Sequence, residues 1–216
     1  METQLFQVLE VEVLTPETFL LHLDRQNFSF KPGQYVVLRN PETGEGREYS
    51  IYSGEKEDRL SFLVREIESG EFSRYLKLLK VGSSIVVEGP RGFFLLDEKT
   101  INKHHILFIA TGTGISPFHS FVKSYSNLDY HVLHGVHFAD EAYGKETFDQ
   151  DRFCLCTSRE EKGDYFGRVS YYLKENQVAE DTVCYLCGNS DMIEEVTNIL
   201  ENYGIAPENI RTEIFF

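Results

Sequence analysis

One stretch of the chain contains no polar residue and runs straight into a glycine-rich turn: Ile106–Ala110, followed by Thr111–Pro117. Continuous apolar strands are typical of parallel sheets that are covered on both faces. The next segment, Phe118–Tyr125, has a helical pattern. A glycine-rich turn that opens into a helix can hold a diphosphate, because the glycines let the ligand approach and the helix start supplies N–H donors. The stretch therefore predicts the first strand–helix unit of a nucleotide-binding parallel sheet.

The rest of the second half alternates strands with helices. We expect strands at Tyr130–Val136, Phe153–Thr157, Thr182–Cys187 and Ile210–Phe216, and helices at Val169–Asn176 and Asp191–Tyr203. This alternation predicts an α/β doubly wound parallel sheet with right-handed crossovers. Ligands of such sheets bind at the carboxyl ends of the strands. Three segments meet there: residues 111–117, Ser158-Arg159 and Gly188–Met192.

In the first half, apolar and polar residues alternate instead. Strands are expected at residues 4–14, 18–23, 36–38, 47–53, 60–66 and 84–88, and such short strands with little helix are typical of a small antiparallel β-barrel. One helix, Arg74–Lys80, follows Gly70–Ser73, with Ser73 as its expected N-cap. The pattern changes in the polar stretch 97–104, so we expect two domains, 1–97 and 104–216.

The expected strand 47–53 has two usable faces. In a regular strand Arg47 and Tyr49 lie on one face, roughly one repeat of ~7 Å apart, whereas Ser50 lies on the other. A cation and an aromatic ring at this spacing suit a ligand with a flat ring at one end and a phosphate at the other. The alternative is an ordinary half-buried strand with a surface arginine.

The charge balance limits the kind of partner. The 216 residues include 21 Lys+Arg and 35 Asp+Glu, for a net charge of −14, which argues against nucleic acid as a partner. A local basic patch is compatible with this balance and would contain Arg74, Lys77, Lys80 and Arg91. We find no signal-peptide pattern and no apolar run near the ~20 residues that cross a bilayer. We therefore expect no membrane insertion and a cytoplasmic location.

The four cysteines form two close pairs, Cys154/Cys156 and Cys184/Cys187. Four thiolates at such spacings can hold zinc or an iron–sulfur cluster. Both pairs, however, fall in expected buried strands, where cysteine is a common small apolar residue. We therefore expect no metal, and no disulfides in a reducing compartment.

Six motifs follow one another along the chain: Pro32–Tyr35, Arg47–Ser53 (RxYSxxS), Gly70–Ser73 (GxxS), Gly89–Phe93, Thr111–Pro117 (GTGIxP) and Cys187–Met192 (CGxxxM). In this order they resemble the ferredoxin–NADP reductase family, in which a flavin-binding barrel is joined to a pyridine-nucleotide domain. The resemblance covers almost the whole chain.

For the first domain the resemblance implies FAD rather than FMN. Arg47 would pair with a flavin phosphate, Tyr49 would pack on the isoalloxazine and Ser50 would lie near the reactive N5. Tyr49 and Ser50 can both serve the flavin only if the strand bends or ends there. The other implied contacts come from Glu48, from the backbone of Leu63, Val64 and Arg65, and from the pyrophosphate loop Gly70, Glu71, Phe72 and Ser73.

For the second domain the resemblance implies NADPH, with NADH as the alternative. Ser158, Arg159 and Arg168 resemble the family's 2′-phosphate pocket, and a guanidinium offers paired donors to phosphate. Arg168 is equally well explained as a solvated charge at a helix start. His137 stands where many bacterial members have an arginine and would carry less charge. The diphosphate would be held by Thr111, Gly112, Thr113 and Gly114, and the CGxxxM motif adds Gly188 and Met192.

Ser50, Cys187 and Glu213 would orient the reacting rings, and Phe215 or Phe216 would cover the flavin unless it packs as a sheet-edge aromatic. The implied enzyme is an FAD-dependent reductase that takes hydride from NADPH and passes electrons to a ferredoxin or flavodoxin. One alternative is an NADH-dependent reductase component of an oxygenase. Another is a non-catalytic flavin-binding electron-transfer subunit. The sequence predicts no oligomeric state.

Overall fold

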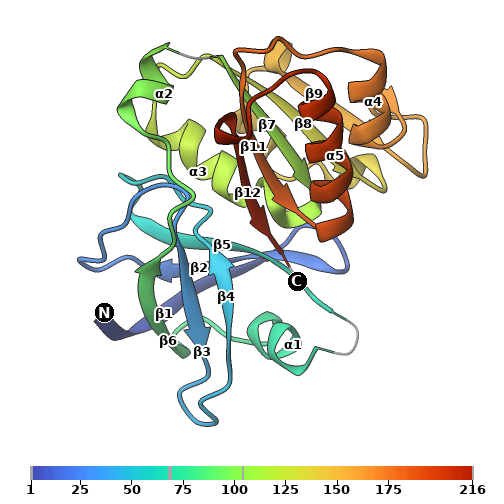
Figure 1. Cartoon of the computed structure of the whole chain (residues 1–216). Coiled ribbons are helices and arrows are strands. Elements are labelled where there is room, and N and C mark those ends of the chain that lie inside the picture. Colours follow the sequence, from blue (N-terminus) through green and yellow to red (C-terminus); the bar gives the residue numbers. More distant parts are fainter. Residues whose placement is uncertain (1, 68–69, 104, 216) are drawn as a thin grey trace. The chain divides into compact units, whose positions relative to one another are not determined.

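The computed structural model describes residues 2–67, 70–103 and 105–215 (Figure 1). By their internal contacts the residues form two compact units. Unit 1 contains Met1–Leu95 together with Ser116–Ser124, and unit 2 contains Leu96–Ile115 together with Tyr125–Phe216. The chain thus leaves unit 2 for one helix and then returns to it.

Unit 1 is built on a six-stranded antiparallel sheet with the strand order β4-β3-β6-β1-β2-β5. Its strands are β1 (Glu2–Val13), β2 (Thr18–Asp24), β3 (Tyr35–Arg39), β4 (Gly46–Ser50), β5 (Arg59–Arg65) and β6 (Ser84–Arg91). The edge strands approach each other where the backbone N–H of Tyr52, just after β4, donates to the carbonyl of Ser61 on β5 at 2.9 Å. The predicted antiparallel β-rich first half is confirmed.

The core of unit 1 is filled by the inward residues of these strands. Phe6, Phe19 and Phe62 are fully buried at its centre. Helix α1 (Glu71–Lys77) adds Phe72 and Leu76 to the same cluster. Burial of such side chains stabilises the fold by ~1.5–3 kcal/mol each, at ~25 cal/mol for each Å² of apolar surface removed from water.

Unit 2 is built on a six-stranded parallel sheet with the order β10-β9-β8-β7-β11-β12, which confirms the predicted α/β second half. Its strands are β7 (Ile106–Thr111), β8 (Tyr130–Val136), β9 (Phe153–Thr157), β10 (Tyr165–Phe166), β11 (Val183–Gly188) and β12 (Ile210–Ile214). Its α-helices are α2 (Glu98–Lys103), α4 (Val169–Glu175) and α5 (Ser190–Asn202). Short 3-10 turns span Gly112–Ile115, Ala139–Glu141, Lys145–Thr147, Gln150–Arg152 and Pro207–Asn209.

Both faces of the parallel sheet are covered. On one face α4 and α5 pack over the strands, with Leu173 and Val196 in the same buried cluster as Ile109. On the other face Phe108 contacts the rings of Tyr130 and Tyr185, at centroid distances of 5.9 and 6.1 Å. This two-sided burial explains why the strands read as continuous apolar runs.

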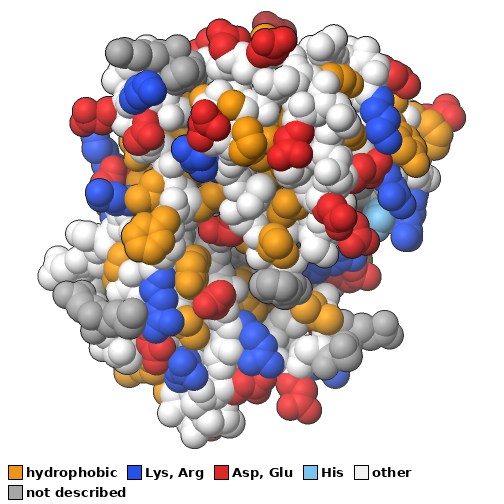
Figure 2. Space-filling view, in the orientation of Figure 1, with side chains coloured by type: hydrophobic (Ala, Val, Ile, Leu, Met, Phe, Trp, Pro, Cys, Tyr) orange, Lys and Arg blue, Asp and Glu red, His pale blue; other side chains and the backbone are white. Residues whose placement is uncertain are grey.

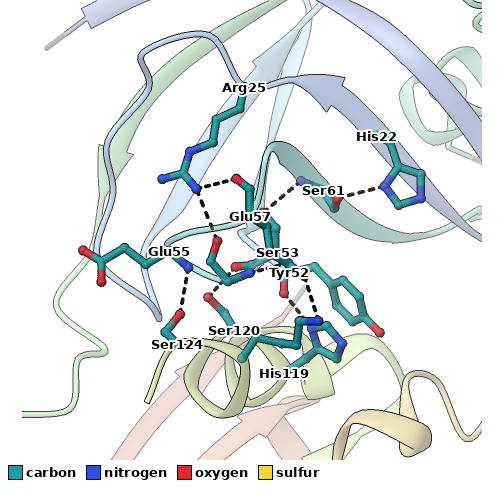
Figure 3. A network of polar contacts seen from close by, with 12 residues as sticks. His22, Arg25, Tyr52, Ser53, Glu55, Glu57, Ser61, His119, Ser120 and Ser124 are labelled. Carbon is teal, nitrogen blue, oxygen red and sulfur yellow. Dashed lines mark hydrogen bonds and ion pairs between the residues drawn. The ribbon is translucent and has the colours of Figure 1, made fainter. Parts of the chain in front are cut away.

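Helix α3 (Ser116–Ser124) packs within unit 1 through a network of polar contacts (Figure 3). The His119 ring stacks on Tyr52 with centroids 3.7 Å apart, and its Nδ1 donates to the Tyr52 carbonyl at 2.8 Å. The Ser120 hydroxyl donates to the Ser53 carbonyl at 2.7 Å. Lys123 also pairs with Glu57 at 2.8 Å. A ring stack, two hydrogen bonds and an ion pair thus hold α3 on the segment that follows β4.

Three expected boundaries are wrong. The strand expected to run to Ser53 ends at Ser50, because Ile51 and Tyr52 bond to Gln34 and Ser61 instead. The helix expected over 74–80 begins at Glu71 and has Gly70 as N-cap, so Ser73 lies inside it. The last strand ends at Ile214, and Phe216 lies outside the described residues.

Three of the four residues that could form a basic patch pair with acids. Arg74 and Lys77 both contact Glu66, at 3.4 and 2.6 Å, and Arg91 contacts Glu88 at 3.4 Å. Figure 2 shows basic and acidic side chains intermingled on the face in view. In the part of the chain that the structure describes, no helix is long and apolar enough to span a bilayer.

Candidate functional site

In unit 1, strand β4 presents the residues of the RxYSxxS motif at the edge of the sheet. Arg47 is exposed and contacts local groups, the Glu45 carboxylate at 3.1 Å and the Gly46 carbonyl at 2.8 Å. Surface pairs of this type contribute ~0–1 kcal/mol. Arg47 can therefore exchange Glu45 for a phosphate at little cost. Glu48 is exposed beside it.

Tyr49 connects β4 to helix α1. Its ring stacks on Phe72 with centroids 6.4 Å apart and planes inclined by 28°, and Phe72 in turn contacts Tyr75 at 5.8 Å. Burial raises the pKa of Tyr49, so the phenol stays neutral at any physiological pH. The structure thus brings the start of α1, Gly70–Ser73, next to the strand that carries Arg47 and Ser50.

Ser50 is the last residue of β4 and is buried. It pairs with Tyr35 in the sheet, and Tyr49 pairs with Val36. After Ser50 the chain leaves β3 and joins β5 through Tyr52. The strand therefore ends at the place where Tyr49 and Ser50 would have to depart from regular alternation to serve one ligand.

The start of α1 offers backbone donors rather than a hydroxyl. The Ser73 Oγ accepts from the Ile67 N–H at 3.0 Å and donates to the Gly70 carbonyl at 3.3 Å, so its proton is in use. The N–H groups of Glu71, Phe72 and Ser73 belong to the first turn, whose donors have no partner within a helix. A phosphate at this turn would be held by backbone N–H groups.

Strand β5 lies at the other edge of the sheet order and carries three residues for which the resemblance implies backbone contacts. The side chains of Leu63 and Val64 are buried in the barrel, and Arg65 pairs with Glu17 at 2.9 Å. The backbone contacts that the resemblance implies for Leu63, Val64 and Arg65 stay predictions.

In unit 2, the turn after β7 packs backbone against backbone on the turn after β11. A Cβ at Gly114 would lie 2.3 Å from the Cys187 carbonyl oxygen, and one at Gly188 would lie 2.1 Å from the Thr111 Oγ1. Asn189 donates to the same Thr111 hydroxyl from its N–H and its amide, at 3.3 and 3.2 Å. The two predicted nucleotide-binding segments therefore form a single pair of loops, here called the nucleotide loop pair (residues 111–114 and 187–189).

Gly112 leaves the nucleotide loop pair open on one side. Its φ is +52°, and a Cβ built there would meet no heavy atom within 4 Å. Thr113 follows it in the same 3-10 turn, Gly112–Ile115. An open glycine backbone beside tightly packed glycines is the arrangement that lets a diphosphate approach main-chain N–H groups.

His134 on β8 supports this turn and was missed by the sequence reasoning. Its Nε2 lies 2.9 Å from the Gly112 carbonyl oxygen. Complete burial lowers the pKa of His134 to about 4, so the neutral ring donates from Nε2. Its Nδ1 is buried without a partner among the described residues. The only available signal was the presence of two histidines, His131 and His134, in a largely apolar strand.

Cys187 and Glu213 lie side by side at the ends of β11 and β12, where they are paired in the register. Burial, and to a lesser extent the Glu213 charge, raises the pKa of Cys187 well above its ordinary value. The thiol is therefore neutral. Phe215 follows at once and is half-buried, with its N–H donating to the Gly188 carbonyl at 2.8 Å. Met192 is buried under the Asn189 cap of α5, as part of the core of unit 2.

Ser158, Arg159 and Arg168 gather at the carboxyl ends of β9 and β10. Phe166 pairs with Thr157, and the Gly167 N–H donates to the Thr157 carbonyl at 2.9 Å. Arg159 and Arg168, both exposed, therefore follow adjacent strand ends. His137 reaches the Ser158 hydroxyl from the end of β8, at 3.1 Å.

The two cysteine pairs do not meet. Cys154 and Cys156 lie on β9, whereas Cys184 and Cys187 lie on β11, and β8 and β7 separate these strands. All four are free thiols. Within residues 2–67, 70–103 and 105–215 there is no group of three or more His, Cys, Asp or Glu side chains that could hold a metal.

Two family models match consecutive parts of the chain. The model for an oxidoreductase FAD-binding domain matches residues 7–95, and the model for an oxidoreductase NAD-binding domain matches residues 108–198. The chain belongs to the ferredoxin–NADP reductase family. The two sites described above fall within these two matches.

Relatives in the ferredoxin–NADP reductase family include reductase components of oxygenases. The toluate 1,2-dioxygenase electron transfer component of Pseudomonas putida is 31% identical, and the anthranilate 1,2-dioxygenase electron transfer component of Acinetobacter baylyi is 30% identical. Each match covers 96% of this chain but only 66% of the relative, so the chain spans slightly less than two thirds of their length. A solved ferredoxin NADP+ reductase from Neisseria gonorrhoeae, with bound FAD and NADP, shares the fold over 100% of both chains, with a TM-score of 0.88 and 24% identity.

The residues of each unit fit the cofactors of the family. In unit 1, the weakly held Arg47 supplies positive charge two residues before Tyr49, and the first turn of α1, which includes its partner Phe72, supplies N–H donors. In unit 2, the open Gly112 within the nucleotide loop pair supplies a cradle for a diphosphate. The individual contacts assigned to these residues stay predictions.

Proposed function

We propose that this protein is an FAD-dependent reductase that uses NADPH and passes electrons to a ferredoxin- or flavodoxin-type acceptor. The observation that carries the proposal is the intact nucleotide loop pair in a chain whose first half matches an FAD-binding domain. A protein that only held flavin would not need Gly114 and Gly188 packed to leave Gly112 open. When bound, NADPH and FAD supply the redox chemistry, a hydride passing from nicotinamide C4 to flavin N5.

The residues of the chain bind and orient rather than transfer protons. Arg47 neutralises a phosphate, and the α1 start donates backbone N–H groups to the pyrophosphate. Cys187 is a neutral thiol, and the Glu213 carboxylate lies next to it on the neighbouring strand. Together they would orient the nicotinamide ring, the thiol as an uncharged contact and the carboxylate as a fixed negative charge. Ser50, which is buried at the end of β4, would help to orient the flavin ring. No side chain needs to act as an acid or base.

The preference for NADPH rests on the cations after β9 and β10. Two exposed guanidiniums, of Arg159 and Arg168, with the Ser158 hydroxyl between the strand ends, match the chemistry of a 2′-phosphate. We also propose a cytoplasmic location, since four free thiols suit a reducing compartment.

The proposal is tested on the purified protein. It should be yellow, bind FAD on reconstitution and oxidise NADPH with an artificial electron acceptor. A protein that stays colourless after incubation with FAD would overturn it. A protein that binds FAD but oxidises neither NADPH nor NADH would instead be a non-catalytic flavin-binding subunit.

The coenzyme preference needs a matched pair of variants. Arg159→Ala should lower kcat/KM for NADPH about tenfold or more while leaving that for NADH unchanged, because one charge-assisted contact is worth ~1.5–3 kcal/mol. Lys162→Ala is the control, since Lys162 lies in the same loop but pairs with Glu160 at 2.9 Å. An unchanged preference in Arg159→Ala contradicts the assignment of the 2′-phosphate pocket.

A second candidate function is an NADH-dependent reductase component of an oxygenase. Two observations favour it: His137 rather than an arginine beside Ser158, and the electron transfer components of dioxygenases among the relatives. A higher kcat/KM for NADH than for NADPH would select this candidate. Faster reduction of an oxygenase-type ferredoxin than of a flavodoxin would identify the acceptor class.

A further inference from the structure

A cavity of about 420 Å³ lies in unit 2, at the amino ends of the parallel strands. Its wall includes His105 and His131 at the starts of β7 and β8, Cys154 on β9, and Tyr172 and Leu173 of α4. The nucleotide loop pair follows the carboxyl ends of β7 and β11, so the cavity lies at the opposite ends of the strands. Its volume falls within the ~300–1,000 Å³ that is usual for small-molecule sites.

One of the four thiols lies in the wall of this cavity. Cys154 is half-buried, whereas Cys156, Cys184 and Cys187 are buried. Burial raises the pKa of the Cys184 thiol to about 12 and that of Cys187 well above its ordinary value. These two thiols lack both the access and the ionisation that a reactive cysteine needs.

The surroundings of Cys154 favour its thiolate. A hydrogen bond from the Cys156 thiol lowers the pKa of Cys154, and one from the Tyr172 phenol adds to it, against the opposing effects of burial and the Asp164 carboxylate. The pKa of Cys156 is raised by its hydrogen bond to Cys154 and by burial. Of the two adjacent thiols, the one with the lowered pKa is thus the half-buried one in the wall of the cavity, where a charge is better solvated.

We propose that Cys154 is a site of reversible S-thiolation by a low-molecular-weight disulfide that enters this cavity. The Cys154 thiolate attacks one sulfur of the disulfide R–S–S–R, that S–S bond breaks, and R–S⁻ leaves as a thiolate. The product is a mixed disulfide between Cys154 and one R–S group, and a free thiol reverses the reaction by the same exchange.

The strand geometry directs the reaction to a mixed disulfide rather than to a Cys154–Cys156 bridge. Two residues apart on β9, the two Cβ atoms lie ~6.6 Å from each other on the same face, whereas a disulfide holds its Cβ atoms ~3.5–4.5 Å apart. The hydrogen-bonded Cys156 therefore serves as a donor to Cys154 and does not resolve the adduct.

An adduct would act on the nucleotide site through α4. Tyr172 and Leu173 line the cavity, and the same helix begins directly after Arg168. A group filling the cavity would press on this helix and so displace Arg168. This consequence rests on the proposed function, in which Arg168 binds the 2′-phosphate, and it should appear as a raised KM for NADPH.

The test is mass spectrometry of the folded protein after incubation with glutathione disulfide at neutral pH. The expected result is one glutathione per chain, located on the tryptic peptide of residues 153–159 and removed by dithiothreitol. That peptide contains both thiols of β9, so Cys156→Ser, which keeps a hydrogen-bond donor, should retain the adduct at a similar rate. Cys156→Ala removes the donor and should react several-fold more slowly. Cys154→Ser should take up none.

Three outcomes would overturn the proposal: adducts spread evenly over the four cysteines, no adduct on the native protein although the urea-unfolded chain reacts, or an internal disulfide that shows as loss of two hydrogens. None of these depends on bound FAD or NADPH, so failure of the proposed function would leave the result intact. Selective thiolation without any change in the KM for NADPH would confirm the site and contradict only its link to Arg168.

Discussion

The imidazole Nε2 of His134 lies 2.9 Å from the carbonyl oxygen of Gly112, so a buried strand residue fixes the turn that opens the nucleotide site. His134→Phe would leave this carbonyl without its donor, which costs ~1–3 kcal/mol of unfolding free energy. The KM for NADPH should rise with it. His134→Gln can still donate and should recover part of both losses. Urea unfolding and steady-state kinetics of the two variants measure the effect, and equal losses in both would argue against a role for the hydrogen bond.

The same residue should make stability depend on pH. Burial lowers the pKa of His134 to about 4, below the ordinary value of 6.5, so the unfolded chain binds the proton more readily than the folded one. The stabilisation is therefore present above pH 6.5 and is lost as the pH falls toward 4, by up to ~3 kcal/mol at 1.36 kcal/mol per pKa unit. Paired carboxylates with lowered pKa values, such as Glu66 and Glu195, also make the folded protein less stable as the pH falls. The quantity to measure is thus the difference between wild type and His134→Gln, which should shrink toward acid pH; a constant difference would contradict the account.

Arg47→Ala should weaken FAD binding about tenfold or more while leaving stability nearly unchanged. The arginine contacts Glu45 only at the surface, where such pairs contribute ~0–1 kcal/mol. Arg59→Ala is a close control, because Arg59 is similarly exposed and pairs with Glu10 at 2.9 Å. Titration of the apoprotein with FAD, followed by flavin fluorescence, separates the two. Equal affinities in both variants would remove Arg47 from the proposed phosphate site.

Two glycines in the nucleotide loop pair should respond differently to alanine. Gly114→Ala places a Cβ 2.3 Å from the Cys187 carbonyl, a backbone atom that cannot move freely, and should destabilise unit 2 markedly. Gly112→Ala meets no atom and carries only the left-handed backbone penalty of ~1–2 kcal/mol. Gly44→Ala, with φ +74° and open space, controls for that penalty away from either site. Thermal unfolding should rank Gly114→Ala as the most destabilised. If Gly112→Ala weakens NADPH binding no more than Gly44→Ala does, the diphosphate does not approach this turn.

The stack of Tyr49 on Phe72 links the flavin strand to α1 and can be weakened without opening a large hole. Phe72→Leu keeps an apolar side chain in the core but removes an aromatic contact worth ~0.5–1.5 kcal/mol beyond its buried area. We expect a modest loss of stability and a clear loss of FAD affinity, because Tyr49 and the α1 start shift together. Tyr75→Leu, at the far end of the same row of rings, should affect FAD less. The reverse order of the two affinities would count against the stack as a support of the flavin site.

Periodicity in the sequence predicted both sheets, because a strand half-exposed to water alternates and a strand buried on both faces does not. It could not predict which residue the buried His134 would contact, since a histidine in a largely apolar strand does not indicate its partner. It also misplaced the start of α1. Gly70 and Ser73 are both plausible N-caps, and the choice is made by Phe72, which has to lie inside the helix to stack on Tyr49 and reach the core. The end of β4 was missed for a similar reason, because the bonds of Ile51 and Tyr52 to Gln34 and Ser61 come from distant parts of the chain.

Helix α3 makes the two halves of the gene inseparable. A fragment ending at the predicted boundary near residue 97 would lack Phe118 and Phe121, which cover Phe94, and it would leave the Tyr52 and Ser53 carbonyls without the groups that now cap them. The complementary fragment would contain α3 without Phe94, the unit 1 residue that Phe118 and Phe121 contact. A chimera that takes unit 1 from a relative should therefore fold only when α3 is taken from the same relative. The sensible points for recombination in this chain are thus set by which segments pack together in space and not by their order in the sequence.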